Sequence, residues 1–589
     1  MPATSLASAA EYRARRERAN DRAALALWRE ALAVAAQRAL ESTYAAMRSG
    51  WLYRQTLRGP VPDRILFQPD DPRPRRLDDA DAMFRGRFRL GGKIIDARER
   101  SIFHMATGDA ALAALHGFDW LRHLEAAGGE PARALALKLA QDWLARNGRY
   151  TRPAWQPEIA AARFLNLFAH GRFFLANSDL LWRSKFFVSL RNQARVLART
   201  TSEAPDGVPR FEAAAALALA GLCLADQKNA AEGLARLSFE ISRQILPDGG
   251  HVTRSPEALL QAFRALAMVD QALAAQQREA KSMLRAALDR MAPMVRFFRM
   301  GDDALAVFNG GGEADARLVA ALLTHDDTGG RPFGHAPHSG YQRLSAGKTQ
   351  IVMDVGRPPP AEFSTAAHAG CLSFEMSAGP QRMIVNCGAA VGGEDHWGTA
   401  LRTTPAHSTL VLDDASSAYL LPEGSLRGFL GARLLPGPTH IDTHRGENEQ
   451  GLVVEASHDG YVRDFGVLHQ RRLALGPRGT KLTGADRLIP GAAHKSRRGR
   501  AEVIPFAIRF HVHPDVRLSL AQGGGSVILK LPTGEGWRFR AGGDGAVSIE
   551  ESIYFGGGTL RRTEQLVVTG QVKDAPVECA WLLEQVTVA

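Results

Sequence analysis

Apolar positions repeat with two different periods along this chain. From Ala9 to about Leu323 they recur at helical spacing. The clearest helical stripe has apolar residues at i, i+4, i+7 and i+14, namely Leu259, Phe263, Leu266 and Leu273. Segments of this kind, roughly 15–20 residues each, follow one another with short breaks, as at 127–129 and 147–148. Such a succession predicts antiparallel helix pairs in a stacked or toroidal array.

The start of the helix that carries this stripe can be read from three residues. Ser255 is a typical capping hydroxyl, Pro256 suits the first turn, and the carboxylate of Glu257 lies where the helix dipole favours negative charge. We therefore expect this helix to begin directly after Ser255.

The period changes to two near residues 328–334. Val527, Leu529 and Leu531 alternate with other residues, a Pro-Thr-Gly-Glu-Gly turn follows, and Trp537 and Phe539 alternate again. Glycine-rich turns recur to the end of the chain. The second half is therefore predicted to be an antiparallel β-sandwich.

Polar side chains are placed within three short apolar runs between residues 366 and 414. These runs read AAHAGCLSFEM, RMIVNCGA and RTTPAHSTLVLDD, and they predict three consecutive strands. They carry His368, Asn386, Arg402 and His407. A site built across neighbouring strands accounts for these residues better than a solvent-exposed face does.

These runs resemble the β-domain of the heparinase II/III family of polysaccharide lyases. Further segments match family elements in the same order along the chain, namely 79–88, 118–121 (FDWL), 245–251 (ILPDGGH), 457–461 (SHDGY) and 469–472 (HQRR). The resemblance implies an N-terminal α/α toroid, an incomplete barrel, followed by an antiparallel β-sandwich. We expect a helical extension over 1–75, the toroid over 76–330 and the sandwich over 331–589.

The family's chemistry is β-elimination on a uronate-containing glycan, which needs a neutralised carboxylate, a base at C5 and an acid at O4. His251 is the best remaining proton carrier, since a neutral imidazole is a competent base and Arg254 and a helix start lie close by. The alternative is that His251 only packs within its loop. Tyr341 could replace the helical tyrosine that this chain lacks, unless it is a core aromatic.

Two arginines are the candidates for substrate binding. The family's Asn-His pair is absent, and residues 207–217 stand in its place; Arg210 there could neutralise a carboxylate, although it cannot act as a base. A solvent-exposed arginine at a helix start is the alternative. Arg402 is expected to bind substrate or to brace the cleft.

His368, Asn386 and His407 lie where the family has its metal site. Ala366, Gly370 and Asn386 replace a histidine and two aspartates of that site. Two imidazoles and an amide form a weak donor set for Zn²⁺. The alternative to a zinc site is a hydrogen-bonded cluster that organises the same strands.

Charge and composition narrow the range of partners. The net charge is +11 over 589 residues, and a basic cluster at 495–500 contributes to it. Such a surface favours polyanions, but there is no nucleic-acid-binding signature, and an arginine-rich proteome would explain the charge as well. The longest apolar run, 213–225, is too short to span a membrane. The four cysteines form no CxxC pair and are expected to be buried thiols.

The first residues are interrupted by charges throughout, which indicates a cytoplasmic protein, although the family works mostly in the cell envelope. Our first hypothesis is a lyase that cleaves an acidic glycan, with a bacterial exopolysaccharide as the favoured substrate over heparin or alginate. The second is a non-catalytic relative that binds an anionic polysaccharide or glycoconjugate. A third is a cytoplasmic structural or assembly protein. The sequence does not indicate an oligomeric state.

Overall fold

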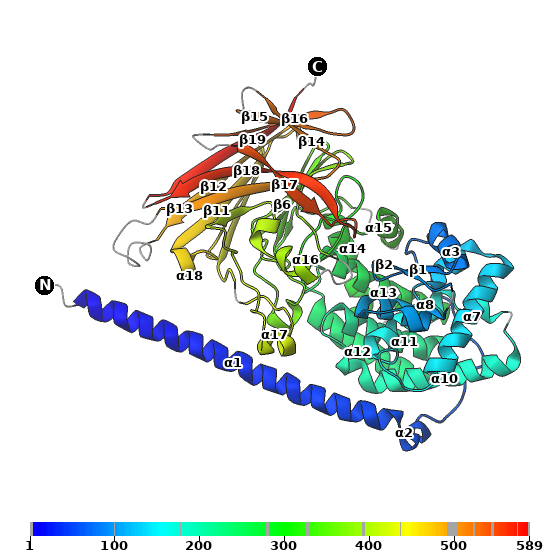
Figure 1. Cartoon of the computed structure of the whole chain (residues 1–589). Helices are drawn as coiled ribbons and strands as arrows, with labels where there is room; N and C mark the ends of the chain where they lie inside the picture. Colours follow the sequence, from blue (N-terminus) through cyan, green and yellow to red (C-terminus); the bar gives the residue numbers. More distant parts are fainter. Residues whose placement is uncertain are drawn as a thin grey trace.

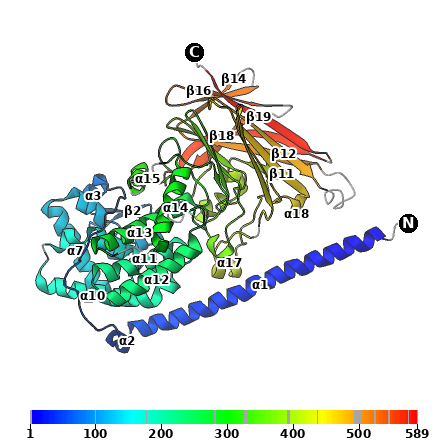
Figure 2. The ribbon, with the colours of Figure 1, turned by 180° about the vertical axis from the view of Figure 1, so that it is seen from behind.

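The computed structural model describes residues 4–586, except 99, 177, 279–281, 325–329, 391–394, 436, 492–502, 522–524, 543–546 and 574. The basic cluster at 495–500 therefore lies outside the described residues. The chain forms a helical body and a body of two β-sheets, which lie side by side in Figures 1 and 2. The last helix of the helical body ends at Leu323, and the first strand of the second body begins at His335.

The helical body is an α/α toroid. Its helices are α2 (Trp51–Gln55), α3 (Leu77–Phe84), α4 (Ile102–Met105), α5 (Asp109–His116), α6 (Leu121–Ala127), α7 (Gly129–Asn147), α8 (Pro157–His170), α9 (Arg172–Leu175), α10 (Leu180–Thr200), α11 (Val208–Cys223), α12 (Gln227–Gln244), α13 (Pro256–Ala275), α14 (Ser282–Phe298) and α15 (Ala316–Leu323). Helix α11 lies at its centre, against α8, α12 and α13. Gly233 allows α11 and α12 to approach closely, because a Cβ there would collide with the backbone of Ala218.

The predicted helix start at Ser255 is confirmed. Its side chain accepts a hydrogen bond from the backbone N–H of Ala258 at 3.4 Å, and Pro256 occupies the first helical position. The predicted stripe of α13 is buried throughout. This helix is the one described helix that is long and apolar enough to cross a membrane, but two thirds of the relevant window is buried in the toroid core, as expected of a core helix.

One element of the helical half departs from the prediction. Strands β1 (Arg87–Leu90) and β2 (Lys93–Asp96) form a two-stranded antiparallel hairpin between α3 and α4. Only Phe88 and Leu90 of β1 are buried, whereas β2 is largely exposed. So short a stretch has too few apolar positions to stand out against the helical pattern around it.

The extension predicted over 1–75 contains a 46-residue helix, α1 (Thr4–Ser49). In Figure 1 α1 runs beneath both bodies, from the side of the sandwich to α2 below the toroid. It packs against α17 (Ser425–Leu430) of the sandwich, where Arg38 donates to the carbonyl oxygens of Gly428 and Phe429. The rest of the predicted extension belongs physically to the toroid, since Leu57 and Ile65 lie in its hydrophobic core.

The second body is a sandwich of two antiparallel sheets, as predicted. One sheet has the order β14-β15-β16-β19-β12-β11-β10-β9, and the other has the order β17-β18-β13-β7-β6-β5-β4-β3 with β8 paired to β13. The strands are β3 (His335–Ala336), β4 (Tyr341–Ala346), β5 (Thr349–Asp354), β6 (Phe374–Ala378), β7 (Gln381–Val385), β8 (Leu410–Leu412), β9 (Ile441–Asn448), β10 (Gly451–His458), β11 (Val467–Leu475), β12 (Lys481–Pro490), β13 (Ile504–Val512), β14 (Arg517–Ala521), β15 (Ser526–Lys530), β16 (Gly536–Ala541), β17 (Val547–Tyr554), β18 (Arg561–Val572) and β19 (Val577–Val586). Two short helices, α16 (Asp395–Ala400) and α18 (Val462–Phe465), lie in its loops.

The hairpin predicted around residues 532–536 is confirmed, since Val527 pairs with Phe539 and Leu529 with Trp537. The prediction of three consecutive strands between 366 and 414 is only partly right. Strands β6 and β7 pair with each other, but β8 is three residues long and pairs with β13. His368 and His407 therefore lie in loops, because backbone hydrogen bonds in these segments go to turns and to a short 3₁₀ helix at 404–406.

Candidate functional site

A cavity of about 460 Å³ opens inside the toroid among helices α5, α8, α11, α13 and α15. Its wall mixes small apolar side chains with hydrogen-bonding groups. The polar groups of the lining are Arg73, Asp119, Arg122, Asn166, Glu212, Glu257, Gln261, Arg264 and Asp315. Such a wall can hydrogen-bond a polar ligand of the size of a sugar ring or two.

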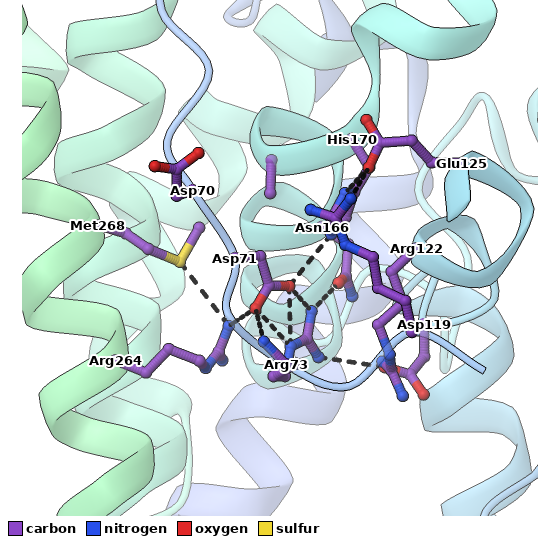
Figure 3. A network of polar contacts seen from close by, with 12 residues as sticks. Asp70, Asp71, Arg73, Asp119, Arg122, Glu125, Asn166, His170, Arg264 and Met268 are labelled. Atoms are coloured by element: carbon purple, nitrogen blue, oxygen red, sulfur yellow. Dashed lines mark hydrogen bonds and ion pairs between the residues drawn. The ribbon is translucent and has the colours of Figure 1, made fainter. Parts of the chain in front are cut away.

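Figure 3 shows an ionic network beside this cavity. It supplies five residues of the lining, namely Arg73, Asp119, Arg122, Asn166 and Arg264. Asp71 lies at its centre, on the segment between α2 and α3. It accepts a hydrogen bond from Nε of Arg73 at 2.9 Å and lies 3.1 Å from Nε2 of His170. Burial by itself would raise the pKa of Asp71, but Arg73, His170 and Arg264 hold that pKa well below its ordinary value. Asp71 is therefore a fixed negative charge that orients the cations around it.

The arginines of the lining are each paired with a carboxylate. Arg73 also contacts Asn166 and lies 3.1 Å from Asp119, and Arg122 pairs with Asp119 as well. Arg264 donates to Oε1 of Glu212 at 2.8 Å. Three arginines in the lining thus face four carboxylates, Asp119, Glu212, Glu257 and Asp315. The cavity has no excess of positive charge, so it suits sugar hydroxyl groups better than a polyanion.

His251 is buried next to the toroid, in the loop that precedes α13. Its Nε2 lies 2.9 Å from Oε1 of Gln244, and its Nδ1 lies 2.7 Å from Oγ1 of Thr253. Burial lowers the pKa of His251 to about 3. With both ring nitrogens bonded inside the protein, this geometry favours the loop-packing alternative over a proton carrier.

The same loop is fastened to the sandwich. Oδ2 of Asp248 accepts hydrogen bonds from the backbone N–H groups of His338 and Ser339, at 2.9 and 2.7 Å. The DGxH-like segment and the segment before Tyr341 therefore hold the two bodies together.

Arg254 and Tyr341 form a closed structural unit. Arg254 has a φ of 61°, donates to backbone carbonyl oxygens of Ser339 and Arg357, and pairs with the buried Asp354. Its guanidinium lies 4.9 Å from the centre of the Tyr341 ring. The Tyr341 hydroxyl donates to the carbonyl oxygen of Arg254 at 2.7 Å and accepts from Asn309, and burial raises its pKa. Neither side chain has a free group for substrate, and the core-aromatic alternative fits Tyr341.

The two arginines expected to bind substrate are bonded within the protein. Arg210 donates to the carbonyl oxygen of Ala204 at 2.9 Å and to Oδ1 of Asp206 at 2.6 Å. Arg402 donates to the carbonyl oxygens of Ala367 and Ser364, at 2.8 and 3.0 Å. Its pKa is lowered to about 10, mainly by burial and further by the positive charge of Arg427. Arg402 thus braces the loop that carries His368.

Only two of the three predicted metal ligands meet. Nδ1 of His368 lies 3.0 Å from Nε2 of His407, whose Nδ1 donates to the carbonyl oxygen of Thr403 at 2.8 Å. The amide of Asn386 is used up on backbone groups, donating to Val307 and accepting from Ser408. No set of three His, Cys, Asp or Glu side chains among the described residues could hold a metal ion.

The donors therefore do not fit zinc, which takes four ligands in its structural sites. The arrangement is that of the hydrogen-bonded cluster expected as the alternative. Elemental analysis of the purified protein tests the zinc that the family resemblance implied.

The segments 457–461 and 469–472 form a second buried network, in the sandwich. The N–H of Gly460 donates to Nδ1 of His458, whose Nε2 lies 3.2 Å from Nδ1 of His469. Nε2 of His469 lies 2.8 Å from Oδ1 of Asp486, which also pairs with Arg471 at 2.7 Å. The family-like segments 457–461 and 469–472 therefore contribute to the internal packing of the sandwich.

The sequence did not single out the polar wall of the toroid cavity, although part of a signal was present. Asn166 and His170 lie four apart on α8, and Arg264 interrupts the apolar positions of α13, so all three share a face with core residues. Asp71 and Arg73 carry no periodic signal, since they lie in an irregular segment. The four cysteines are free and buried, as predicted.

Comparisons with known proteins agree with this architecture. Residues 328–582 match the family model "Heparinase II/III-like, C-terminal". FtsZ-localized protein C of Caulobacter vibrioides is 34% identical over 525 residues, which are 87% of this chain and 89% of that protein.

Two of the similar solved structures are polysaccharide lyases. A mutant of the heparan sulfate lyase HepC from Pedobacter heparinus has a TM-score of 0.58 at 16% identity, covering 91% of this chain and 87% of its own. Heparinase III has a TM-score of 0.60 at 15% identity, covering 82% and 78%. At these identities the likeness concerns the fold. The family match, the full-length relative and the shared architecture together show that this chain belongs to the heparinase II/III-like family.

Proposed function

We propose that this chain is a polysaccharide-lyase-like protein that localises with FtsZ and holds a saccharide in its toroid cavity. The observation that carries the first part is the 34% identity to FtsZ-localized protein C along nearly the full length of both chains. The two solved lyase structures named above are only 15–16% identical, over 82–91% of this chain. A cytoplasmic location, expected from the sequence, is part of this proposal.

Localisation is tested with a fluorescent fusion of the full chain in cells that also carry labelled FtsZ. We expect the two labels to coincide at the division site and to disperse together when FtsZ is depleted. Purified protein should also sediment with FtsZ polymers and stay in the supernatant when FtsZ is kept unassembled. A fusion spread evenly through cells with intact FtsZ rings would contradict the proposal.

The second part of the proposal rests on the toroid cavity. Its arginines are held in place by carboxylates, so their remaining N–H groups and the exposed carboxylate oxygens form a rigid set of donors and acceptors. Pre-organised groups lose little freedom on binding, which favours ligands with many hydroxyl groups. Calorimetry with a panel of neutral and acidic oligosaccharides tests this, and heat from none of them would remove the cavity as a saccharide site.

A second candidate function is cleavage of an acidic glycan by β-elimination. The family and fold favour it, and Arg122 or Arg264 could neutralise the carboxylate of a uronate bound in the cavity. The described lining residues include no histidine, tyrosine or lysine, so the bases available in the cavity are carboxylates. Asp119 and Glu212 are paired with arginines, Glu257 accepts from the N–H of Gly312, and Asp315 accepts from the N–H of Arg317. The lyase candidate therefore rests on the family and the fold.

Absorbance of the unsaturated uronate product separates the two candidates. Acidic glycans, including a bacterial exopolysaccharide, heparan and alginate, would be incubated with the wild type, with His251→Ala and with Arg264→Met. Product that vanishes in His251→Ala, while that variant keeps its helical signal, would support the catalytic role predicted for His251. Saccharide binding without product from any glycan supports the binding protein.

A further inference from the structure

A basic pocket lies on the toroid, outside the cavity already described. Its volume is about 890 Å³, and it lies between α3, the segment that follows β2, and α7. Five cations line it, namely Arg85, Arg98, Arg100, Lys138 and Arg146. The lining contains one carboxylate among its described residues, that of Asp142. This is a local excess of positive charge that the toroid cavity does not have.

Only part of this charge is compensated by ion pairs. Asp96 accepts from Nε of Arg98 at 2.9 Å, and Asp142 accepts from Nε of Arg146 at 2.8 Å. The exposed side chains of Arg85, Arg100 and Lys138 make no ion pair with any residue that the structure describes; Glu99 lies outside those residues. Cations from three separate elements therefore converge on one hollow, where their mutual repulsion favours an anion.

The floor of the pocket is apolar. Met83, Phe88, Ile102 and Leu139 are buried beneath it, and the Phe84 ring in its wall is 44% exposed. An apolar floor under a cationic rim suits a ligand whose ring faces are apolar and whose edges carry anionic groups. A sugar ring with a carboxylate or sulfate has both features. Guanidinium groups bind such anionic groups through paired hydrogen bonds, so the arginines of the rim suit them.

We propose that this pocket binds the acidic groups of a uronate- or sulfate-bearing oligosaccharide, as an anchoring site separate from the toroid cavity. The sugar identity rests on the proposed function, whereas the anion site rests on the arrangement of the five cations. The division of labour follows from the charges: the cavity is balanced and binds hydroxyl groups, and the basic pocket holds the acidic part of the chain.

The test compares two double charge reversals in the full-length protein. Arg85→Glu with Lys138→Glu reverses two exposed cations of the pocket, and Lys228→Glu with Arg517→Glu reverses two exposed cations elsewhere, with the same change in net charge. Binding of a labelled heparin octasaccharide and of a polygalacturonate oligomer is measured by anisotropy. We expect roughly tenfold weaker binding and a shallower salt dependence for the pocket variant, and less than about a twofold change for the control.

Each other outcome overturns part of the proposal. Equal losses in both variants mean that only net charge matters, and an unchanged pocket variant removes the anion site. Polyglutamate or inorganic polyphosphate that binds the wild type as tightly as the oligosaccharides, with the same loss in the pocket variant, removes the sugar identity. Thermal unfolding of both variants shows whether they are folded. Failure of FtsZ co-localisation would leave these binding results unaffected, so the two proposals fail separately.

Discussion

The two halves of the molecule each contain a buried network of an aspartate, an arginine and a histidine. In the toroid these are Asp71, Arg73 and His170, and in the sandwich they are Asp486, Arg471 and His469. The distances and the residue types are nearly the same. The surroundings differ.

The toroid network reaches the wall of a 460 Å³ cavity through Arg73. The sandwich network is sealed, since Nη1 of Arg471 donates to the carbonyl oxygens of Leu372 and Ser408. These hydrogen bonds tie the two sheets together. Buried ions of the same kind thus serve a ligand site in one half and sheet packing in the other. Whether the network borders accessible space decides its role, and the residue types do not.

The sealed network should be the more costly to break. Asp486→Ala removes the partner of Arg471, His469 and the indole N–H of Trp581, and leaves a buried cation without compensation. We expect a loss of about 3–5 kcal/mol in the free energy of unfolding, measured by urea denaturation. A loss below about 1 kcal/mol would show that water reaches this site.

The matched change in the toroid should cost less and should also affect binding. In Asp71→Ala, Arg73 and Arg264 keep other carboxylates, Asp119 and Glu212, as partners. We expect a loss of about 2 kcal/mol in stability, together with weaker saccharide binding by calorimetry, because Arg73 is no longer held in place. Equal losses of stability in Asp71→Ala and Asp486→Ala would erase the contrast between the two networks.

Acid should lower the stability of the protein through the histidines of the sealed network. Burial, and then His469, lower the pKa of His458 well below its ordinary value. The folded state therefore keeps this ring neutral while the unfolded state takes up a proton below about pH 6.5, so the stability present above that pH is lost as the pH falls.

His458→Gln should lower the slope of stability against pH by about 1.4 kcal/mol per unit between about pH 6 and 5. His440→Gln, which replaces an exposed histidine, is the control for the chemical change itself. Urea titrations at several pH values measure both slopes. The same slope for wild type and His458→Gln would mean that His458 titrates normally in the fold.

The smallest expected effect concerns a single hydrogen-bonding group of the cavity. Gln261 lies in the lining and donates to Glu257 four residues earlier at 3.4 Å. Gln261→Ala should weaken saccharide binding by about 1 kcal/mol, roughly fivefold, and change stability by less than about 0.5 kcal/mol. Gln37→Ala, which removes a similar Gln–Glu pair on α1, is the control and should leave binding unchanged. Identical affinities for both variants would place the saccharide elsewhere.

The fold could be predicted much further than the site. The stripe of α13, its start at Ser255 and the β15–β16 hairpin followed from spacing alone. Of the predicted site, the structure brings together the pair His368 and His407. His251, Arg254 and Tyr341 also lie in one region, but all three are bonded inward. A family resemblance predicts where a residue lies along the chain, but it does not predict the direction in which the side chain points.

The amino-acid sequence by itself determined the two periods, the caps and turns that end each element, and the order of helical and β halves. These features depend on backbone geometry within a few residues. The tertiary structure alone decided that Arg73, Asn166 and Arg264 share a cavity wall, while Asp486 and Arg471 are sealed between sheets. Accessibility is a property of contacts between segments far apart in the chain, so no local pattern can specify it.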